Sequence, residues 1–111
     1  MNGGTLDGKQ IFGRRTVQRA VAETSFLEVD SFLGAPVRYG MGFMLGAEWL
    51  SLYGPHSPHA FGHVGFTTVV AYADPERHIS VGLMTSGKPF ITPGQLAWVN
   101  VARTIANRTR K

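Results

Sequence analysis

The chain has 111 residues, of which 43% are hydrophobic and 16% are charged, and it contains no cysteine. This composition excludes an intrinsically disordered tail and a small secreted protein held together by disulfides. The length predicts one domain or part of one, and no apolar run approaches the ~20 residues that span a bilayer. The first residues lack the basic start and apolar middle of a signal peptide. The compartment therefore stays open, and would be cytoplasmic if the chain is complete.

The excess of positive charge is concentrated at the C-terminal end. Eleven lysines and arginines against seven acidic residues give a formal net charge of +4. Four of these cations are Arg103, Arg108, Arg110 and Lys111, and cations at this end complement the dipole of a terminal helix. Because no basic stripe interleaved with aromatic residues accompanies them, we expect no nucleic-acid partner.

The first half of the chain predicts a short helix, a loop and a strand. Residues 14–23 carry apolar positions at three- and four-residue spacing after Gly13, a tolerable N-cap, and so predict an amphipathic helix. Residues 25–36 fit neither the helical nor the strand period, which predicts a packed loop. Residues 37–47 are apolar but contain three glycines, which favours a strand that another part of the chain approaches closely.

A long loop and a β-hairpin follow. Residues 51–62 contain two prolines and several turn-forming residues, and loops of this length are often functional. Residues 66–73 and 79–85 are rich in β-branched and apolar residues and predict two strands. Asp74 and Pro75 between them suit the first two positions of a type I turn.

The last predicted element is a long helix with complete start signals. Thr92 is the expected N-cap, Pro93 the first helical residue, and Gln95 the partner in a capping box. Its apolar positions predict one broad face lying on the sheet, formed by Leu96, Trp98, Val99, Val101, Ala102, Ile105 and Ala106.

These elements predict an α+β fold, with an antiparallel sheet and the C-terminal helix packed on one face. One good helix packed on a sheet of about three strands can cover only one face of that sheet. The strands of the hairpin are apolar enough that both of their faces are expected to be covered. We therefore expect a further layer that these 111 residues do not supply.

The densest group of titratable side chains is His56, His59 and His63. Spacings of three and four would place them on one face of a helix, where histidines can ligate a metal. Pro58 and Gly62 disfavour a helix there, and no acidic residue or cysteine lies within the group. The sequence therefore predicts neither a metal site nor an organic cofactor, and His56, His59 and His78 are expected in solvated loops and turns.

The residues around His63 resemble a known family. The run Phe-Gly-His-Val-Gly over residues 61–65 precedes an apolar strand, Asp-Pro-Glu-Arg at 74–77, a second strand and a capped helix. This order resembles the C-terminal part of the serine β-lactamases, penicillin-binding proteins and family VIII carboxylesterases. Residues 2–12 resemble the family's loop before a helix, and residues 39–46 its glycine-rich strand. The resemblance covers nearly the whole chain and implies the β-lactamase/transpeptidase-like fold.

The resemblance also implies three site residues. His63 and Gly65 would form the His-x-Gly variant of the family's Lys-Thr-Gly box, with His63 replacing the lysine beside a serine nucleophile. Gly65 would let the strand approach the bound acyl group, and the N–H of Phe66 would be one of two oxyanion-hole donors. The alternative for His63 is a strand-end histidine that hydrogen-bonds a nearby carbonyl.

The chain departs from the family pattern at two levels. Phe66, Thr67 and Thr68 are bulkier than the residues that often follow the box in the family. The sequence also contains no Ser-x-x-Lys, no Tyr-x-Asn and no Gly-x-Ser-x-Gly motif. The nucleophile and its base are therefore missing from these 111 residues.

Two interpretations follow from this absence. In the first, residues 1–111 are a partial β-lactamase-like domain, the C-terminal section of a serine hydrolase of small esters or amides that is inactive alone. Its partner would be the missing N-terminal part of the same fold or a self-associating copy. In the second, the chain is a small binding module that uses residues 53–66, with Trp49, Tyr53, Phe61 and Phe66 as an exposed apolar patch.

Overall fold

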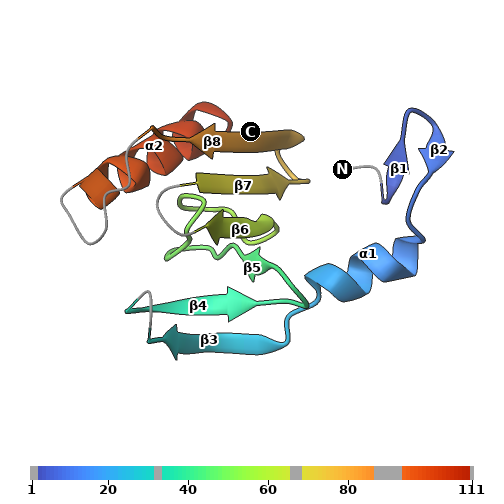
Figure 1. Cartoon of the computed structure of the whole chain (residues 1–111), viewed down its shortest axis with the longest axis horizontal. Helices are drawn as coiled ribbons and strands as arrows, with labels where there is room; N and C mark the ends of the chain where they lie inside the picture. Colours follow the sequence, from blue (N-terminus) through green and yellow to red (C-terminus); the bar gives the residue numbers. More distant parts are fainter. Residues whose placement is uncertain (1–2, 32–33, 66–68, 87–93, 111) are drawn as a thin grey trace.

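The computed structural model describes residues 3–31, 34–65, 69–86 and 94–110. Six strands form one antiparallel sheet in the order β3-β4-β5-β6-β7-β8, and a long helix lies against it (Figure 1). A separate two-stranded hairpin and a short helix precede the sheet. The elements are β1 (Thr5–Leu6), β2 (Lys9–Gln10), α1 (Arg14–Val21), β3 (Ser25–Asp30), β4 (Ala35–Tyr39), β5 (Met44–Leu45), β6 (Phe61–Gly65), β7 (Val69–Asp74), β8 (Ile79–Met84) and α2 (Gly94–Arg108). The predicted α+β class is confirmed.

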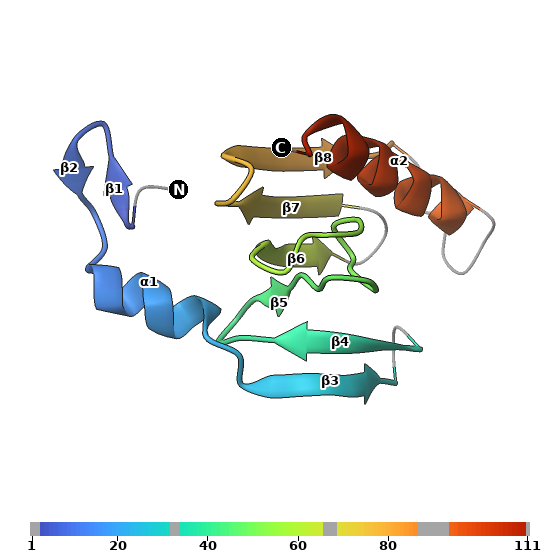
Figure 2. The same ribbon diagram turned by 180° about the vertical axis from the view of Figure 1, so that it is seen from behind.

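Helix α2 covers one face of the sheet, and the views from front and behind place it on that side alone (Figures 1 and 2). Its buried residues Ala102 and Ala106 lie one helical turn apart, and Trp98, one turn earlier, packs against the core. The predicted broad apolar face is wrong at Val99 and Val101, which are exposed. The contact is narrower because small alanines bring the helix close to the chain beneath it. The predicted cap at Thr92 and Pro93 lies outside the described residues.

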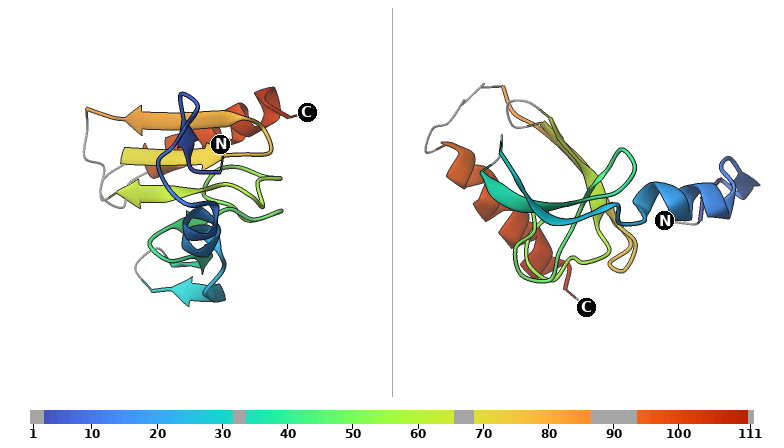
Figure 3. Two further views of the ribbon diagram at one scale, coloured as in Figure 1. Left: turned by 90° about the vertical axis from the view of Figure 1, so that its right-hand side faces the viewer. Right: turned by 90° about the horizontal axis from the view of Figure 1, so that it is seen from below.

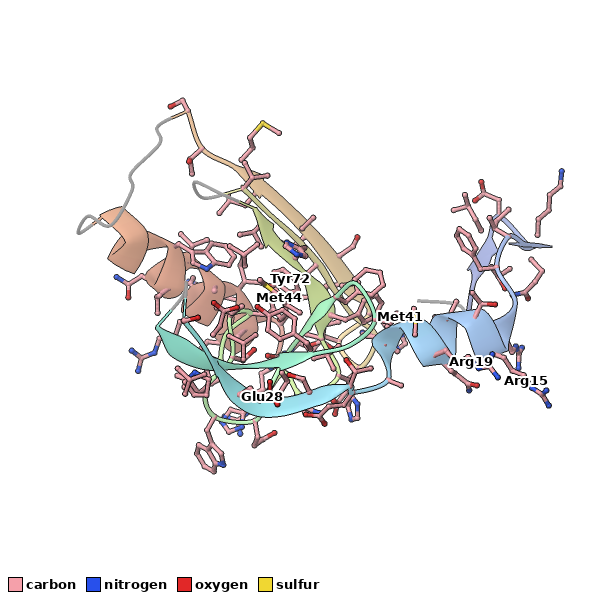
Figure 4. The ribbon with its side chains drawn as sticks, turned by 60° about the horizontal axis from the view of Figure 1, so that its bottom comes forward. Arg15, Arg19, Glu28, Met41, Met44 and Tyr72 are labelled. Atoms are coloured by element: carbon pink, nitrogen blue, oxygen red, sulfur yellow. The ribbon has the colours of Figure 1, made fainter. Side chains whose placement is uncertain are left out.

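The strands of the predicted hairpin alternate between the two faces. In β7, Val70, Tyr72 and Asp74 are buried whereas Val69 and Ala71 are exposed. Figure 4 shows Tyr72 and Met44 pointing into the core beneath the sheet. The face opposite α2 carries no helix in the described part of the chain, which agrees with the prediction that one helix covers only one side.

The predicted loop over residues 25–36 is wrong, because this segment forms β3 and the start of β4. The two strands pair in antiparallel register from Ser25↔Tyr39 to Asp30↔Ala35, with a register shift between Ser25 and Glu28. Such an irregularity places two residues opposite one and breaks the two-residue alternation. The alternation of apolar and polar residues that identifies a strand was therefore not visible in the sequence.

The predicted single strand over residues 37–47 is also wrong, because it is two strands joined by a turn. Gly42 adopts φ +85°, a left-handed conformation that glycine reaches without a Cβ penalty. The Gly40 N–H donates to the Phe43 carbonyl at 2.8 Å and closes the turn. The close approach expected at these glycines is present, since a Cβ at Gly40 would lie 2.8 Å from the Ala20 carbonyl oxygen at the end of α1.

The long loop before β6 is folded into the core. Tyr53 and Ser57 are each 1% exposed. The Tyr53 hydroxyl donates to the Met44 carbonyl at 3.0 Å, and its ring stacks on Tyr72 with centroids 4.6 Å apart. The loop therefore forms part of the layer under the sheet.

A buried ion pair connects this loop to the β7–β8 turn. Asp74 accepts hydrogen bonds from the N–H groups of Glu76 and Arg77 and from the Arg77 guanidinium at 2.6 Å. The same guanidinium donates to the carbonyls of Pro55 and His56, at 3.2 and 2.6 Å. The side chains of Asp74 and Arg77 are only 1% and 8% exposed. The Arg77 guanidinium therefore provides hydrogen bonds to one carboxylate and two backbone carbonyls that are shielded from water.

No helix within the described ranges is both long enough and apolar enough to cross a membrane.

Replacing Arg77 by alanine should lower the free energy of unfolding by about 3–5 kcal/mol, because a buried carboxylate loses its charged partner. The measurement is the urea midpoint at fixed protein concentration. Arg103→Ala is the matched control, since Arg103 is exposed on α2. Equal midpoints for the two variants would contradict this role of the pair.

Candidate functional site: the open face of strand β6

Strand β6 presents three of the family-motif positions to the uncovered sheet face. Phe61, His63 and Gly65 alternate with Gly62 and Val64, so they share the face opposite α2. The residues paired with them on β7 are Ala73, Ala71 and Val69. Of the three, His63 is exposed. The structure therefore places the predicted His63 and Gly65 together on an accessible surface.

The His63 ring makes a local hydrogen bond. Its Nδ1 lies 2.9 Å from the Val64 carbonyl oxygen, and a carbonyl accepts, so the ring nitrogen donates. This assigns the proton of the neutral ring to Nδ1 and leaves Nε2 as an acceptor. The carbonyl contact of the alternative interpretation is thus present, and it also orients the free nitrogen of the ring.

Gly62 and Gly65 differ in what surrounds them. A Cβ at Gly65 would meet Val69 atoms at 3.4 and 3.6 Å, which is ordinary van der Waals contact. A Cβ at Gly62 would lie 2.5 Å from the Tyr72 Cα, so the pairing of β6 with β7 requires glycine there. The neighbours described around Gly65 leave room for a side chain, and the third predicted residue, Phe66, lies outside the described residues.

Two of the other histidines each contact a different acidic residue. His56 Nδ1 contacts the Glu48 carboxylate, and His59 Nε2 lies 3.9 Å from Glu76. His78 occupies the β7–β8 turn with φ +55°. Across the described ranges, no three histidine or acidic side chains are grouped as metal ligands.

Among the described residues, the aromatic patch expected for a binding module does not form, and Phe66 lies outside them. Tyr53 and Phe61 are buried, whereas Trp49 is 82% exposed. The Phe61 ring packs edge-on against Phe43, with centroids 5.4 Å apart. Tyr53 is buried because the loop folds under the sheet, and Phe61 is buried against Phe43 on the opposite face, so the prediction of an exposed patch is wrong for these two residues.

An apolar groove lies beside β6, which we call the α1 groove. The helix α1 and the β1–β2 hairpin extend away from the sheet, as seen from below in Figure 3. Between them and the sheet is a space of about 440 Å³, whose walls include Leu6, Phe12, Val17, Val21, Phe43 and Phe61. The helical spacing of Val17 and Val21 predicted an apolar face on α1, but nothing in the sequence linked it to Phe61.

The exit of α1 is tied to the sheet by a charged contact. The Arg38 guanidinium binds both oxygens of Glu23, each at 2.9 Å, and donates to the Gly46 carbonyl at 2.6 Å. The bond from Arg38 lowers the pKa of the Glu23 carboxyl. Met41, near the end of α1 in Figure 4, donates its N–H to the Ala20 carbonyl at 3.0 Å. These contacts position the α1 wall of the groove.

Comparisons with known proteins now define the class. The family described as Beta-lactamase matches residues 4–106. This match covers most of the chain, so the chain belongs to the beta-lactamase family.

Among solved structures, two chains match. One is a family VIII carboxylesterase that is 31% identical, superposes with a TM-score of 0.62, and is matched over 93% of this chain. The chain spans 28% of the length of that carboxylesterase. No curated protein matches. The predicted resemblance to the β-lactamase and carboxylesterase superfamily is confirmed, and the fold is serine-hydrolase-like.

Ionisation of Tyr39 should lower the free energy of unfolding at high pH. Burial, then the 2.5 Å hydrogen bond to Asp30, raises the pKa of Tyr39 from 10.0 to about 12. The folded state therefore holds the phenol proton more tightly than the unfolded state. The stability from this group is complete below pH 10 and is lost as the pH rises toward about 12. We expect Tyr39→Phe to flatten the fall in unfolding free energy across this window. An unchanged slope would contradict the assignment.

Proposed function

We propose that the chain is the C-terminal section of a serine hydrolase that acts through a serine acyl-enzyme, with esters as the favoured substrates. On this proposal the 111 residues are inactive alone. The observation that carries it is His63, exposed on the uncovered face of β6 with Gly65 two residues further on that face.

The motif content of the chain supports a nucleophile from elsewhere. The 111 residues contain no Ser-x-x-Lys and no Tyr-x-Asn, whereas acylation needs an activated serine. The carboxylesterase that matches is more than three times as long as the matched section, since the chain spans 28% of it. The missing N-terminal part of the same fold, or a second copy, is the partner that we propose.

The exposed surface supports such a partner. The chain exposes 7717 Å², roughly 1,700 Å² more than expected of a compact protein of its mass. One side of a standard protein–protein interface buries only about 800 Å². Large apolar side chains are exposed on the open face as well, among them Val69 and Met84. A further layer on this face would account for both observations.

In the proposed mechanism His63 acts beside the incoming serine. Because Nδ1 donates to the Val64 carbonyl, Nε2 is left as an acceptor that would assist proton transfer around the serine, whose own base, like the serine, would come from the missing part of the fold. The oxygen of the tetrahedral intermediate would accept one hydrogen bond from the backbone N–H of Phe66 and another from the backbone N–H of the nucleophilic serine. A donor of this kind lowers the barrier by about 2.7–4 kcal/mol.

Esters are favoured over β-lactams because histidine replaces lysine in the box. A lysine ammonium is a point charge suited to hold a substrate carboxylate, whereas an imidazole can donate and accept hydrogen bonds without carrying a charge. A neutral imidazole suits a substrate that brings an uncharged alkoxy group. One solved structure that matches is a family VIII carboxylesterase.

A fluorophosphonate serine probe tests the origin of the nucleophile. Applied to lysate of the source cells, it should label a protein that contains these 111 residues and is heavier than 12.1 kDa, as read by intact mass. The 111-residue chain alone should stay unlabelled, should not hydrolyse esters, and should self-associate. An unlabelled native protein of 12.1 kDa that unfolds cooperatively as a monomer would refute the proposal.

Replacing His63 tests its role in the labelled protein. His63→Ala should lower kcat for a short-chain ester by about 10²-fold or more, the usual contribution of a general acid–base group. His78→Ala is the control, because His78 is exposed in the distant β7–β8 turn. Equal kinetics for the two variants would remove His63 from the mechanism.

A further inference from the structure

The α1 groove has the size and chemistry of a site for an alkyl chain. Its volume of about 440 Å³ falls within the range of about 300–1,000 Å³ typical of small-molecule sites. None of the described residues that line it is charged, and most are aliphatic or aromatic. A ligand that fits this lining gains from burying methylene groups and needs no polar partner inside the groove.

The α1 groove and the face that carries His63 share one residue, Phe61. Phe61 lines the groove and stands two positions before His63 on the same side of β6. Two strand residues correspond to about 6.6 Å. The strand runs from the groove at Phe61 toward Gly65, so a linear molecule lying along it would connect His63 to the groove.

We propose that the α1 groove binds the distal part of the alkyl chain of a medium- to long-chain ester whose carbonyl lies beside His63. This inference rests on the proposed function and adds its substrate class. With carbon–carbon bonds of about 1.5 Å, about five carbons are needed to bridge the distance from His63 to Phe61. Acetyl and butyryl chains end before the groove, whereas octanoyl and decanoyl chains enter it.

The groove wall is fixed well enough to select by length. Arg38 and Glu23 hold the exit of α1 against β4, and the Phe43–Phe61 ring pair lines the groove on the side of the sheet. Leu6 and Phe12, which are 64% and 61% exposed, would be covered by the bound chain. Their exposure is otherwise unfavourable for side chains of this size.

The test compares p-nitrophenyl acetate, butyrate, octanoate and decanoate in the protein that carries this chain and its serine. Val17→Phe fills the groove and should lower kcat/KM for the two long esters at least about tenfold, with acetate unchanged. Val99→Phe is the matched control, because Val99 is exposed on α2. Phe12→Ala is the second variant, for the case in which Val17→Phe does not fold. It removes an exposed wall of the groove and should also lower the preference for long esters.

Binding of methyl octanoate to the same protein, followed by NMR shifts of the Val17 and Val21 methyl groups, separates this inference from the proposed function. Hydrolysis that is equally fast for all four esters, or equally impaired by Val17→Phe, would overturn the groove assignment and leave the hydrolase intact. Binding of methyl octanoate that Val17→Phe abolishes, without serine-dependent hydrolysis of any ester, would refute the hydrolase and keep an alkyl-chain site. If the protein neither binds methyl octanoate nor prefers long esters, another part of the protein fills the groove, and the inference is overturned.

Discussion

The buried contact between Asp74 and Arg77 connects the segments on which the site depends. Asp74 ends β7, and Arg77 reaches from the following turn to two carbonyls of the loop before β6. That loop carries Tyr53 beneath Tyr72 and leads directly into Phe61. The interaction therefore fixes the end of the β6–β7 pair at which Phe61 pairs with Ala73. A buried ion pair is weak evidence for net stability, but its geometry permits only one arrangement of the groups it joins.

The two faces of the sheet are in different energetic situations. On one face, the core of Val37, Met44, Val70 and Tyr72 is covered by Tyr53 and α2. On the other, alternate residues of the same strands meet solvent. Antiparallel sheets with one polar face are common, but this face is not polar, since Val69 and Met84 stand on it. An apolar open face that also carries a histidine fits a substrate or a further protein layer better than it fits water.

The sequence predicted the elements with strong local signals and missed those defined by distant contacts. The β7–β8 hairpin was recognisable because Asp74 and Pro75 interrupt two β-branched runs. The β3–β4 pair was missed because its register shift hides the alternation. The family motif singled out His63 and Gly65 as candidate site residues, whereas nothing in the sequence pointed to the α1 groove. Its walls come from the β1–β2 hairpin, α1, Phe43 and Phe61, which only the folded chain brings together.

Strand β6 divides its residues between stability and chemistry, so its register determines both. A shift by one residue would turn His63 into the core and Val64 to the open face. Gly62 prevents this, because only a residue without a Cβ fits against the Tyr72 backbone, and Tyr72 is held in turn by its stacking on Tyr53. A partnerless imidazole in the core would cost far more than an exposed valine. The glycine before the histidine is therefore the residue that orients it, and the second glycine of the motif is free to serve whatever binds on the open face.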